Sequence, residues 1–203
     1  MQIRELGVPD AYEVTPRIFG DDRGEFVEWY RFDRLAEVIG YPLVLRQANT
    51  SVSRRGVIRG IHFADVPPGQ AKYVTVTHGA GLDFVVDIRE GSPTFGTWDS
   101  VRLDATDRKA VYIGEGIGHA FVALTDEATL TYLVSETYDP SAEHDINVLD
   151  PDIGLEFPEE LGAPVLSPKD EQAPFLADLL AAGSLPKWDI VRAHYTTLKT
   201  KGA

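Results

Sequence analysis

The sequence of 203 residues contains no cysteine. This absence excludes a disulfide framework, a thiolate zinc site and a cysteine nucleophile. Long apolar runs are also missing, and the opening residues, MQIREL, contain no apolar signal region. We therefore expect a cytoplasmic protein with no membrane partner.

Basic residues are scarce, with 19 Lys and Arg against 32 Asp and Glu and a net charge of −13 at pH 7. A chain this acidic lacks a broad positive surface, so we expect no nucleic-acid partner. A small anionic ligand remains compatible, because it needs only a local cluster of cations. The 43% hydrophobic and 25% charged residues are ordinary for a globular protein with one substantial core.

Strand patterns dominate the chain from about residue 15 to residue 157. Turn sequences such as Pro67-Pro68-Gly69 separate many short runs of β-branched and aromatic residues, which is typical of an antiparallel sandwich or barrel. Helices are predicted at 32–39, 173–183 and 188–198. Without repeats or linkers, we expect one domain over 1–203, with a helical C-terminal segment at about 171–203.

The most informative segment runs from Gly56 to Val76 and contains Arg59, His62 and Lys72. Cations and an imidazole inside a β-barrel indicate an anionic or reactive ligand. An anion clamp, a base and an oxyanion partner together suit proton abstraction beside a carbonyl. However, Arg59 and His62 have opposite parity, so a regular strand points them apart. A bulge at Gly60 would re-aim one of them.

Alternation in the segment LRQANTSVS puts four polar residues on one strand face: Gln47, Asn49, Ser51 and Ser53. The pattern alone favours a solvated face, whereas a ligand-binding barrel would turn these residues inward. Tyr132 and Tyr138 are six positions apart and are predicted to share a face of one regular strand. Tyrosines at this spacing are more commonly core residues than catalytic ones.

The sequence resembles the dTDP-4-dehydrorhamnose 3,5-epimerase family in nine segments that follow the family's order: DDRGEFVEWYR, RQANTSVS, GVIRGIHF, PPGQAKY, VVDIREGSPTFGTWDSVRLD, GIGHAF, TYLVSETYDP, LDPDIGLEFP and VLSPKDEQAP. They cover about residues 15–174. The resemblance implies an all-β, cupin-like double-stranded β-helix (jelly roll) with short C-terminal helices. It also implies a homodimer with N-terminal strand exchange, a dTDP-4-keto-6-deoxyhexose substrate and no cofactor.

The resemblance further implies the roles of individual residues. His62 and Asp170 would form the base, Lys72 would lie near the ketone oxygen, and Tyr132 would return the proton from the opposite face. The implied substrate-binding residues are Gln47, Asn49, Arg59, His119 and Lys169 for the sugar and diphosphate, Tyr138 on the nucleotide side, and Arg23, Phe26 and Glu28 from the neighbouring subunit.

The implied chemistry suits these residue types. Both C3 and C5 of a 4-keto sugar flank the carbonyl, so removing either proton gives an enolate that a cation stabilises. An imidazole with a carboxylate partner suits the base, and a phenol can return the proton. We expect inversion of C3 and C5 of dTDP-4-keto-6-deoxy-D-glucose to dTDP-4-keto-L-rhamnose, without a redox cofactor.

Several alternatives remain open. Lys72 could be an edge-strand gatekeeper, Asp170 the N-cap of a following helix, and His119 a structural histidine. Gly118-His119-Ala120-Phe121 replaces the Ala-His-Gly-Phe often found in the family, and resembles relatives that tailor deoxysugars for antibiotics. A mono-epimerase, a ketoisomerase and a non-catalytic sugar-nucleotide binding protein are therefore the competing hypotheses.

Metal-binding cupins carry two histidines one residue apart and a nearby carboxylate. The histidines of this chain show no such pair; they are His62, His78, His119, His144 and His194. We therefore predict that the protein has no metal site.

Overall fold

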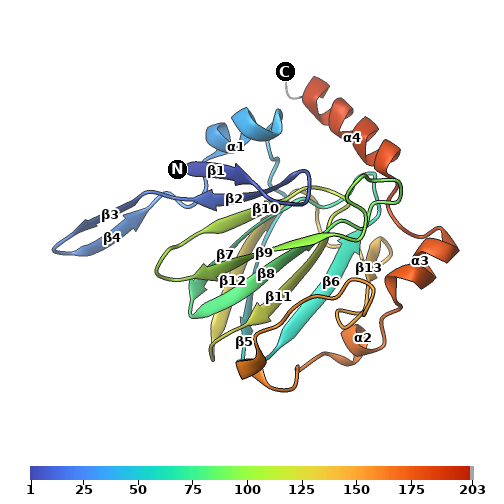
Figure 1. Cartoon of the computed structure of the whole chain (residues 1–203). Coiled ribbons are helices and arrows are strands. Elements are labelled where there is room, and N and C mark those ends of the chain that lie inside the picture. The colour runs from blue at the N-terminus through green and yellow to red at the C-terminus, as the bar shows by residue number, and fades with distance from the viewer. Residues whose placement is uncertain (202–203) are drawn as a thin grey trace.

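The computed structural model describes residues 1–201 and is built around two antiparallel sheets (Figure 1). The six-stranded sheet has the order β1 (Gln2–Glu5), β2 (Ala11–Thr15), β10 (Ala110–Ile113), β7 (Lys72–His78), β12 (Ala128–Val134) and β5 (Gln47–Ser53). The five-stranded sheet has the order β13 (Glu143–Asp145), β6 (Ile58–Ala64), β11 (Gly118–Ala123), β8 (Ala80–Val86) and β9 (Trp98–Asp104). These sheets confirm the predicted all-β jelly roll.

Strand alternation explains how the two sheets enclose a core. Val74 of β7, Val111 of β10 and Phe121 of β11 belong to one buried cluster between the sheets. Their neighbours Tyr73 and Tyr112 point the other way and belong to a separate cluster on the outside of the six-stranded sheet. Each strand therefore contributes one face to the interior and one to an outer layer.

Helices and loops cover both outer faces. The chain after β13, which includes η1 (Glu159–Leu161), α2 (Pro168–Glu171) and α3 (Leu176–Ala182), packs against the five-stranded sheet through Ile146 and Leu176. Two helices pack against the outer face of the six-stranded sheet: α1 (Phe32–Ile39) through Leu35 and α4 (Trp188–Lys201) through Tyr195. No helix within residues 1–201 is both long enough and apolar enough to cross a membrane.

The helix predictions hold with adjusted ends. α1 has the predicted bounds, and α3 ends at Ala182 with Gly183 as its C-cap, whose φ of 65° is left-handed as a helix stop requires. However, α3 begins at Leu176 rather than residue 173, because the chain is still extended at Phe175. α4 continues to Lys201. Residues 202–203 of the predicted C-terminal segment lie outside the described residues.

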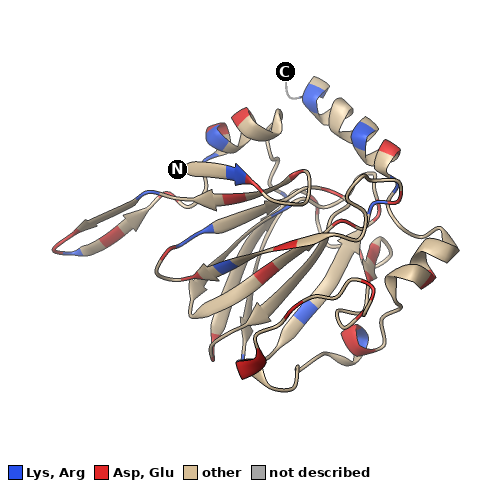
Figure 2. Ribbon diagram, in the orientation of Figure 1, with Lys and Arg blue, Asp and Glu red and all other residues tan. Residues whose placement is uncertain are grey.

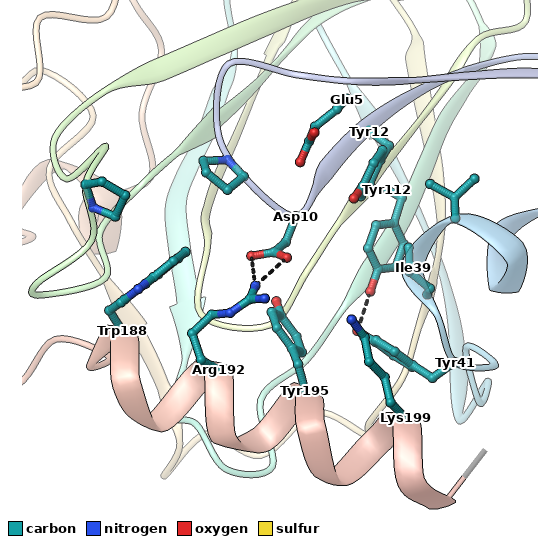
Figure 3. Close-up of a pocket in the computed structure, with 13 residues that line it drawn as sticks. Glu5, Asp10, Tyr12, Ile39, Tyr41, Tyr112, Trp188, Arg192, Tyr195 and Lys199 are labelled. Carbon is teal, nitrogen blue, oxygen red and sulfur yellow. Dashed lines mark hydrogen bonds and ion pairs between the residues drawn. The ribbon is translucent and has the colours of Figure 1, made fainter. Parts of the chain in front are cut away.

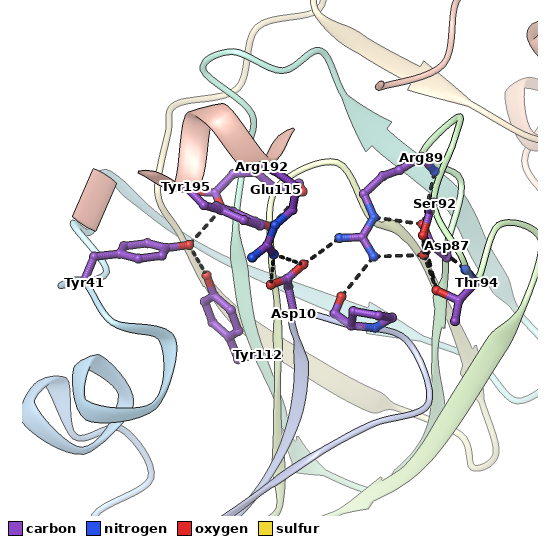
Figure 4. Close-up of polar contacts among 11 residues, drawn as sticks. Asp10, Tyr41, Asp87, Arg89, Ser92, Thr94, Tyr112, Glu115, Arg192 and Tyr195 are labelled. Atoms are coloured by element: carbon purple, nitrogen blue, oxygen red, sulfur yellow. Dashed lines mark hydrogen bonds and ion pairs between the residues drawn. The ribbon is translucent and has the colours of Figure 1, made fainter. Parts of the chain in front are cut away.

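A buried ion-pair network ties α4 to the β1–β2 connection (Figure 4). The fully buried Arg89 guanidinium lies 2.8 Å from carboxylate oxygens of both Asp87 and Asp10. The Asp10 carboxylate also accepts a hydrogen bond from Arg192 of α4 at 3.0 Å. Because the buried cation has two carboxylate partners, its desolvation is compensated.

The same region contains a buried carboxyl, Glu115, which is 3% exposed. Its side chain accepts a hydrogen bond from Tyr41 at 3.2 Å, and its backbone carbonyl accepts one from Tyr195 at 3.0 Å (Figure 4). Burial raises the pKa of Glu115 to about 7, and the nearby Asp10 carboxylate acts in the same direction.

A cavity of about 420 Å³ lies beside this network, between α4, α1 and the β1–β2 connection (Figure 3). Tyr12, Tyr112 and Tyr195 line it. All three pack on the outer side of the six-stranded sheet. The cavity is therefore separated by that sheet from the interior between the sheets.

Glu115→Gln should flatten the pH dependence of stability. Because the folded-state pKa is above the unfolded value, this group's contribution is complete below about pH 4.5 and is lost as the pH rises through 7. We expect the wild type to lose about 3 kcal/mol more unfolding free energy than the variant between pH 4.5 and 8, as measured by urea denaturation. Parallel pH curves for the two proteins would contradict the burial argument.

Candidate active site

The interior between the sheets is apolar at one end and polar at the other. On β7, Lys72 shares its inward face with Val74 and Val76, and on β11, His119 shares its inward face with Phe121. The inward side chains of β5 are the more buried ones, whereas Ala48, Thr50 and Val52 are exposed. This alternation agrees with a polar lining rather than a solvated face for Gln47, Asn49, Ser51 and Ser53.

A bulge in β6 resolves the parity conflict between Arg59 and His62. In the pairing with β11, His62 faces His119 and Arg59 faces Phe121, so two β6 residues lie opposite the single residue Ala120. The extra position includes Gly60, whose φ of 118° is one that L side chains rarely adopt. The bulge places Arg59 and His62 on the same face, as predicted.

His62 and Asp170 form a close pair, with Nε2 2.7 Å from Oδ1. Asp170 lies inside α2, and Ser167 is the N-cap of that helix, so the alternative N-cap role of Asp170 is wrong. Ser167 also donates a hydrogen bond to Asp170 Oδ2 at 2.7 Å. Burial acts to raise the pKa of Asp170, but the hydrogen bonds from His62 and Ser167 outweigh it and lower the pKa. An ionised Asp170 therefore accepts a hydrogen bond from the Nε2–H of His62, which leaves Nδ1 with its lone pair.

Lys72 is buried in a central strand, since β7 lies between β10 and β12. The edge-gatekeeper alternative is therefore wrong. Burial lowers the pKa of Lys72, and the carboxylates of Glu143, Asp83 and Asp145 oppose this effect. Within residues 1–201 no carboxylate lies within 4.0 Å of its ammonium group. The ammonium is thus available to a ligand in the interior.

Tyr132 faces the interior from the opposite sheet to His62. It lies directly across from Asn49 in the β12–β5 pairing. Burial raises the pKa of Tyr132, while the Arg59 cation acts in the opposite direction. A phenol with a raised pKa keeps its proton at neutral pH and can donate it.

Tyr138 does not share a strand face with Tyr132, so that prediction is wrong. β12 ends at Val134, before Tyr138, which is 59% exposed. The Tyr138 backbone N–H donates to Gln47 Oε1 at 3.1 Å, which places it beside the polar end of β5.

A second histidine–carboxylate pair lies next to the first. His119 Nε2 is 2.7 Å from Oδ1 of Asp83, which is 1% exposed. Sequence reasoning missed Asp83, although a carboxylate on the same strand face as the buried Val85 was a usable signal. It also missed Glu143 and Asp145, because the three-residue strand β13 lacks β-branched residues.

Some of the expected substrate-binding residues lie at the site within one chain, and others lie away from it. Lys169 lies at the site, 3.0 Å from Asp145 Oδ1. Arg23 and Phe26 belong to the hairpin of β3 (Ile18–Asp21) and β4 (Gly24–Val27), and Glu28 follows it; the hairpin projects away from the sheets (Figure 1). Within one chain these three residues are not brought to the interior.

The donor atoms of His62, Asp145 and Asp170 lie within 4.8 Å of one another. The His62–Asp170 hydrogen bond and the Lys169–Asp145 ion pair account for this cluster, so we assign no metal to it. Acidic and basic residues are both scattered along the ribbon, and the basic positions are not concentrated in one part of it (Figure 2).

The fold and the site define a jelly-roll protein with an interior acid–base centre. The family model for dTDP-4-dehydrorhamnose 3,5-epimerase matches residues 5–178, and the chain belongs to this family. A dTDP-4-dehydrorhamnose 3-epimerase from Streptomyces niveus is 55% identical, with 95% of this chain and 92% of the relative covered. A dTDP-4-dehydrorhamnose 3,5-epimerase from Mycolicibacterium smegmatis is 51% identical, with 98% of each covered. The solved 3'-monoepimerase from Streptomyces bikiniensis in complex with dTDP-quinovose superposes with a TM-score of 0.93 at 44% identity, covering 96% of this chain and 98% of that one.

Gly60→Ala should destabilise the protein by about 2 kcal/mol or more, because a Cβ at this position would meet the His119 carbonyl oxygen and Ala120. Gly96→Ala is the matched control, since Gly96 also has a positive φ but a methyl group added there would have nothing within 4 Å. The control substitution should lower the unfolding free energy by only about 1 kcal/mol. Equal urea midpoints for the two variants would show that the bulge tolerates a side chain.

Proposed function

We propose that the chain is an epimerase that acts on dTDP-4-keto-6-deoxy-D-glucose. It inverts C3 and C5 through an enolate and gives dTDP-4-keto-L-rhamnose. The observation that carries this proposal is the His62–Asp170 pair, 2.7 Å apart, facing the same interior as Tyr132 on the other sheet. Membership of the family, and the dTDP-sugar bound by a solved relative, support the substrate class.

In the first step, His62 Nδ1 takes a proton from the carbon beside the ketone. The imidazolium that forms keeps its Nε2–H on the ionised Asp170, which compensates the new positive charge. The electron pair of the broken C–H bond moves onto the ketone oxygen. Lys72 stabilises that oxygen, because its buried ammonium interacts most strongly with charge that develops in the transition state.

In the second step, Tyr132 returns a proton to the opposite face of the same carbon. The reaction leaves a tyrosinate and an imidazolium, and one proton passed between them through solvent restores the starting state. The raised pKa of Tyr132 favours this recovery, because the phenol readily regains its proton.

The remaining polar residues of the interior and its mouth hold the substrate. Arg59 and Lys169 supply positive charge for the diphosphate despite the acidic chain. Gln47, Asn49 and His119 contact the sugar, and Tyr138 contacts the nucleotide side. Arg23, Phe26 and Glu28 reach the site of a second subunit, which agrees with the projecting hairpin.

A single inversion is the main alternative. The relative at 55% identity is named a 3-epimerase and the one at 51% a 3,5-epimerase, so identity does not separate the two outcomes. A ketoisomerase would use the same base and enolate. A non-catalytic binding protein is disfavoured, because it would have no use for a buried base, acid and cation together.

Incubation with dTDP-4-keto-6-deoxyglucose in deuterated water, read by NMR, tests the function. We expect deuterium at both C3 and C5, and His62→Asn should slow the exchange by about 10²- to 10⁴-fold. Tyr132→Phe should retain exchange while losing inversion, and pretreatment with EDTA should change nothing. Label at one carbon only would establish a mono-epimerase; tight dTDP binding without any exchange would favour the binding protein.

The hairpin predicts a homodimer. Phe26 is 65% exposed and packs on Phe19, which is itself 43% exposed, so burial against a second copy would remove apolar surface from water. Light scattering should give about twice the chain mass of 22.4 kDa. Phe26→Asp should weaken the dimer, whereas Phe32→Ser, at a similarly exposed site on α1, should not. A monomer at micromolar concentration would refute the dimer.

A further inference from the structure

Asp145 is a second carboxylate beside the proposed base. Its Oδ1 lies 3.5 Å from His62 Nε2 and 3.0 Å from Lys169 Nζ. The β13–β6 pairing sets Asp145 directly opposite His62, so the backbone itself holds the carboxylate in place. The side chain is only 14% exposed. No step of the proposed mechanism uses this residue.

The sequence of α2 places a positive charge near His62, which a second carboxylate would compensate. Lys169 immediately precedes Asp170, so the helix that carries the partner of His62 also carries an ammonium group to the same place. An ammonium near the imidazole would disfavour the imidazolium that proton abstraction produces. Asp145 contacts both groups with one oxygen and therefore compensates both positive charges.

We propose that Asp145 is a positioning residue of the acid–base site, which holds Lys169 and stabilises the imidazolium formed on His62. Its role in turnover rests on the proposed function, but its effect on His62 exists in the free protein. The contact with Asp145 also raises the pKa of Lys169, which agrees with a tight pair.

Other charged groups also face His62 and limit the size of the effect. They are Arg59 on β6 itself, Asp170 and Lys169 on α2, Glu143 on β13, His119 with its partner Asp83 on β11 and β8, and Lys72 with the titratable Tyr132 on the facing sheet. Since Asp170 stays at 2.7 Å, removing the Asp145 charge leaves the dyad intact. The expected change is therefore a shift in proton affinity and not a loss of the base.

The first test is an NMR titration of the His62 imidazole in the free protein. Asp145→Asn keeps the shape of the side chain and removes a negative charge 3.5 Å from Nε2, so the titration midpoint should fall. The acidic limb of kcat/KM should move to lower pH by the same amount. Asp65→Asn is the matched control, because Asp65, which directly follows β6, forms a similar pair with His144 of β13 at 2.9 Å. It should leave the midpoint of His62 unchanged.

Lys169→Met should have the opposite effect and raise the midpoint, because it removes a cation and frees Asp145 for His62. In the double variant, the titration midpoint of His62 should lie between the midpoints of the two single variants. The Lys169→Met titration also tests the proposal by itself if the Asp145→Asn variant fails to fold. A purely structural role for Asp145 would give no such pair of opposite shifts.

An unchanged midpoint in Asp145→Asn, or in Lys169→Met, would overturn the proposal. The titration needs no turnover, so its result is separate from that of the proposed function. Opposite shifts in a protein that exchanges no substrate proton would support the role of Asp145 and reject the proposed reaction.

Discussion

Charge buried between two sheets is the constraint on which the rest of the site depends. Lys72, His119 and Asp83 are each less than 10% exposed and share the interior with an apolar core. Desolvated ions are costly unless a partner of opposite charge or a hydrogen bond compensates them. Each of the two inward histidines therefore has a carboxylate partner at 2.7 Å. By contrast, no carboxylate within residues 1–201 lies within 4.0 Å of the Lys72 amino group. The burial of Lys72 is therefore opposed only by the more distant carboxylates of Glu143, Asp83 and Asp145 among the described residues.

The two sheets divide the proposed chemistry between them. His62 and Asp145 belong to the five-stranded sheet and Asp170 to the adjoining helix α2, whereas Lys72 and Tyr132 extend from the six-stranded sheet. A sugar ring between the sheets would present one face to each, which is the arrangement that inversion requires. Because His62, Lys72 and Tyr132 stand on paired strands, sheet hydrogen bonding and the hydrophobic layers behind β6 and β7 set their positions, while α2 holds Asp170.

Much of this arrangement could be read from the residues. Period-two alternation grouped the polar residues of β5 on one face, although the pattern alone favoured solvent for that face, and the opposite parity of Arg59 and His62 pointed to the bulge at Gly60. What could not be read was the pairing between distant strands. Asp145 meets His62 only because β13 pairs with β6, and its short strand has no pattern of its own. Tyr138 was misplaced for a related reason, since periodicity does not show where a strand stops.

The bulge in β6 has an implication for how such a site can change over time. Its extra residue is what turns Arg59 and His62 to a common face, so the chemistry depends on the length of the strand as well as on its side chains. Loss of a single codon there would rotate one of the two out of the barrel while leaving every catalytic residue type in the gene. A single-residue insertion or deletion in this strand can therefore disrupt the site as thoroughly as a substitution of His62 itself.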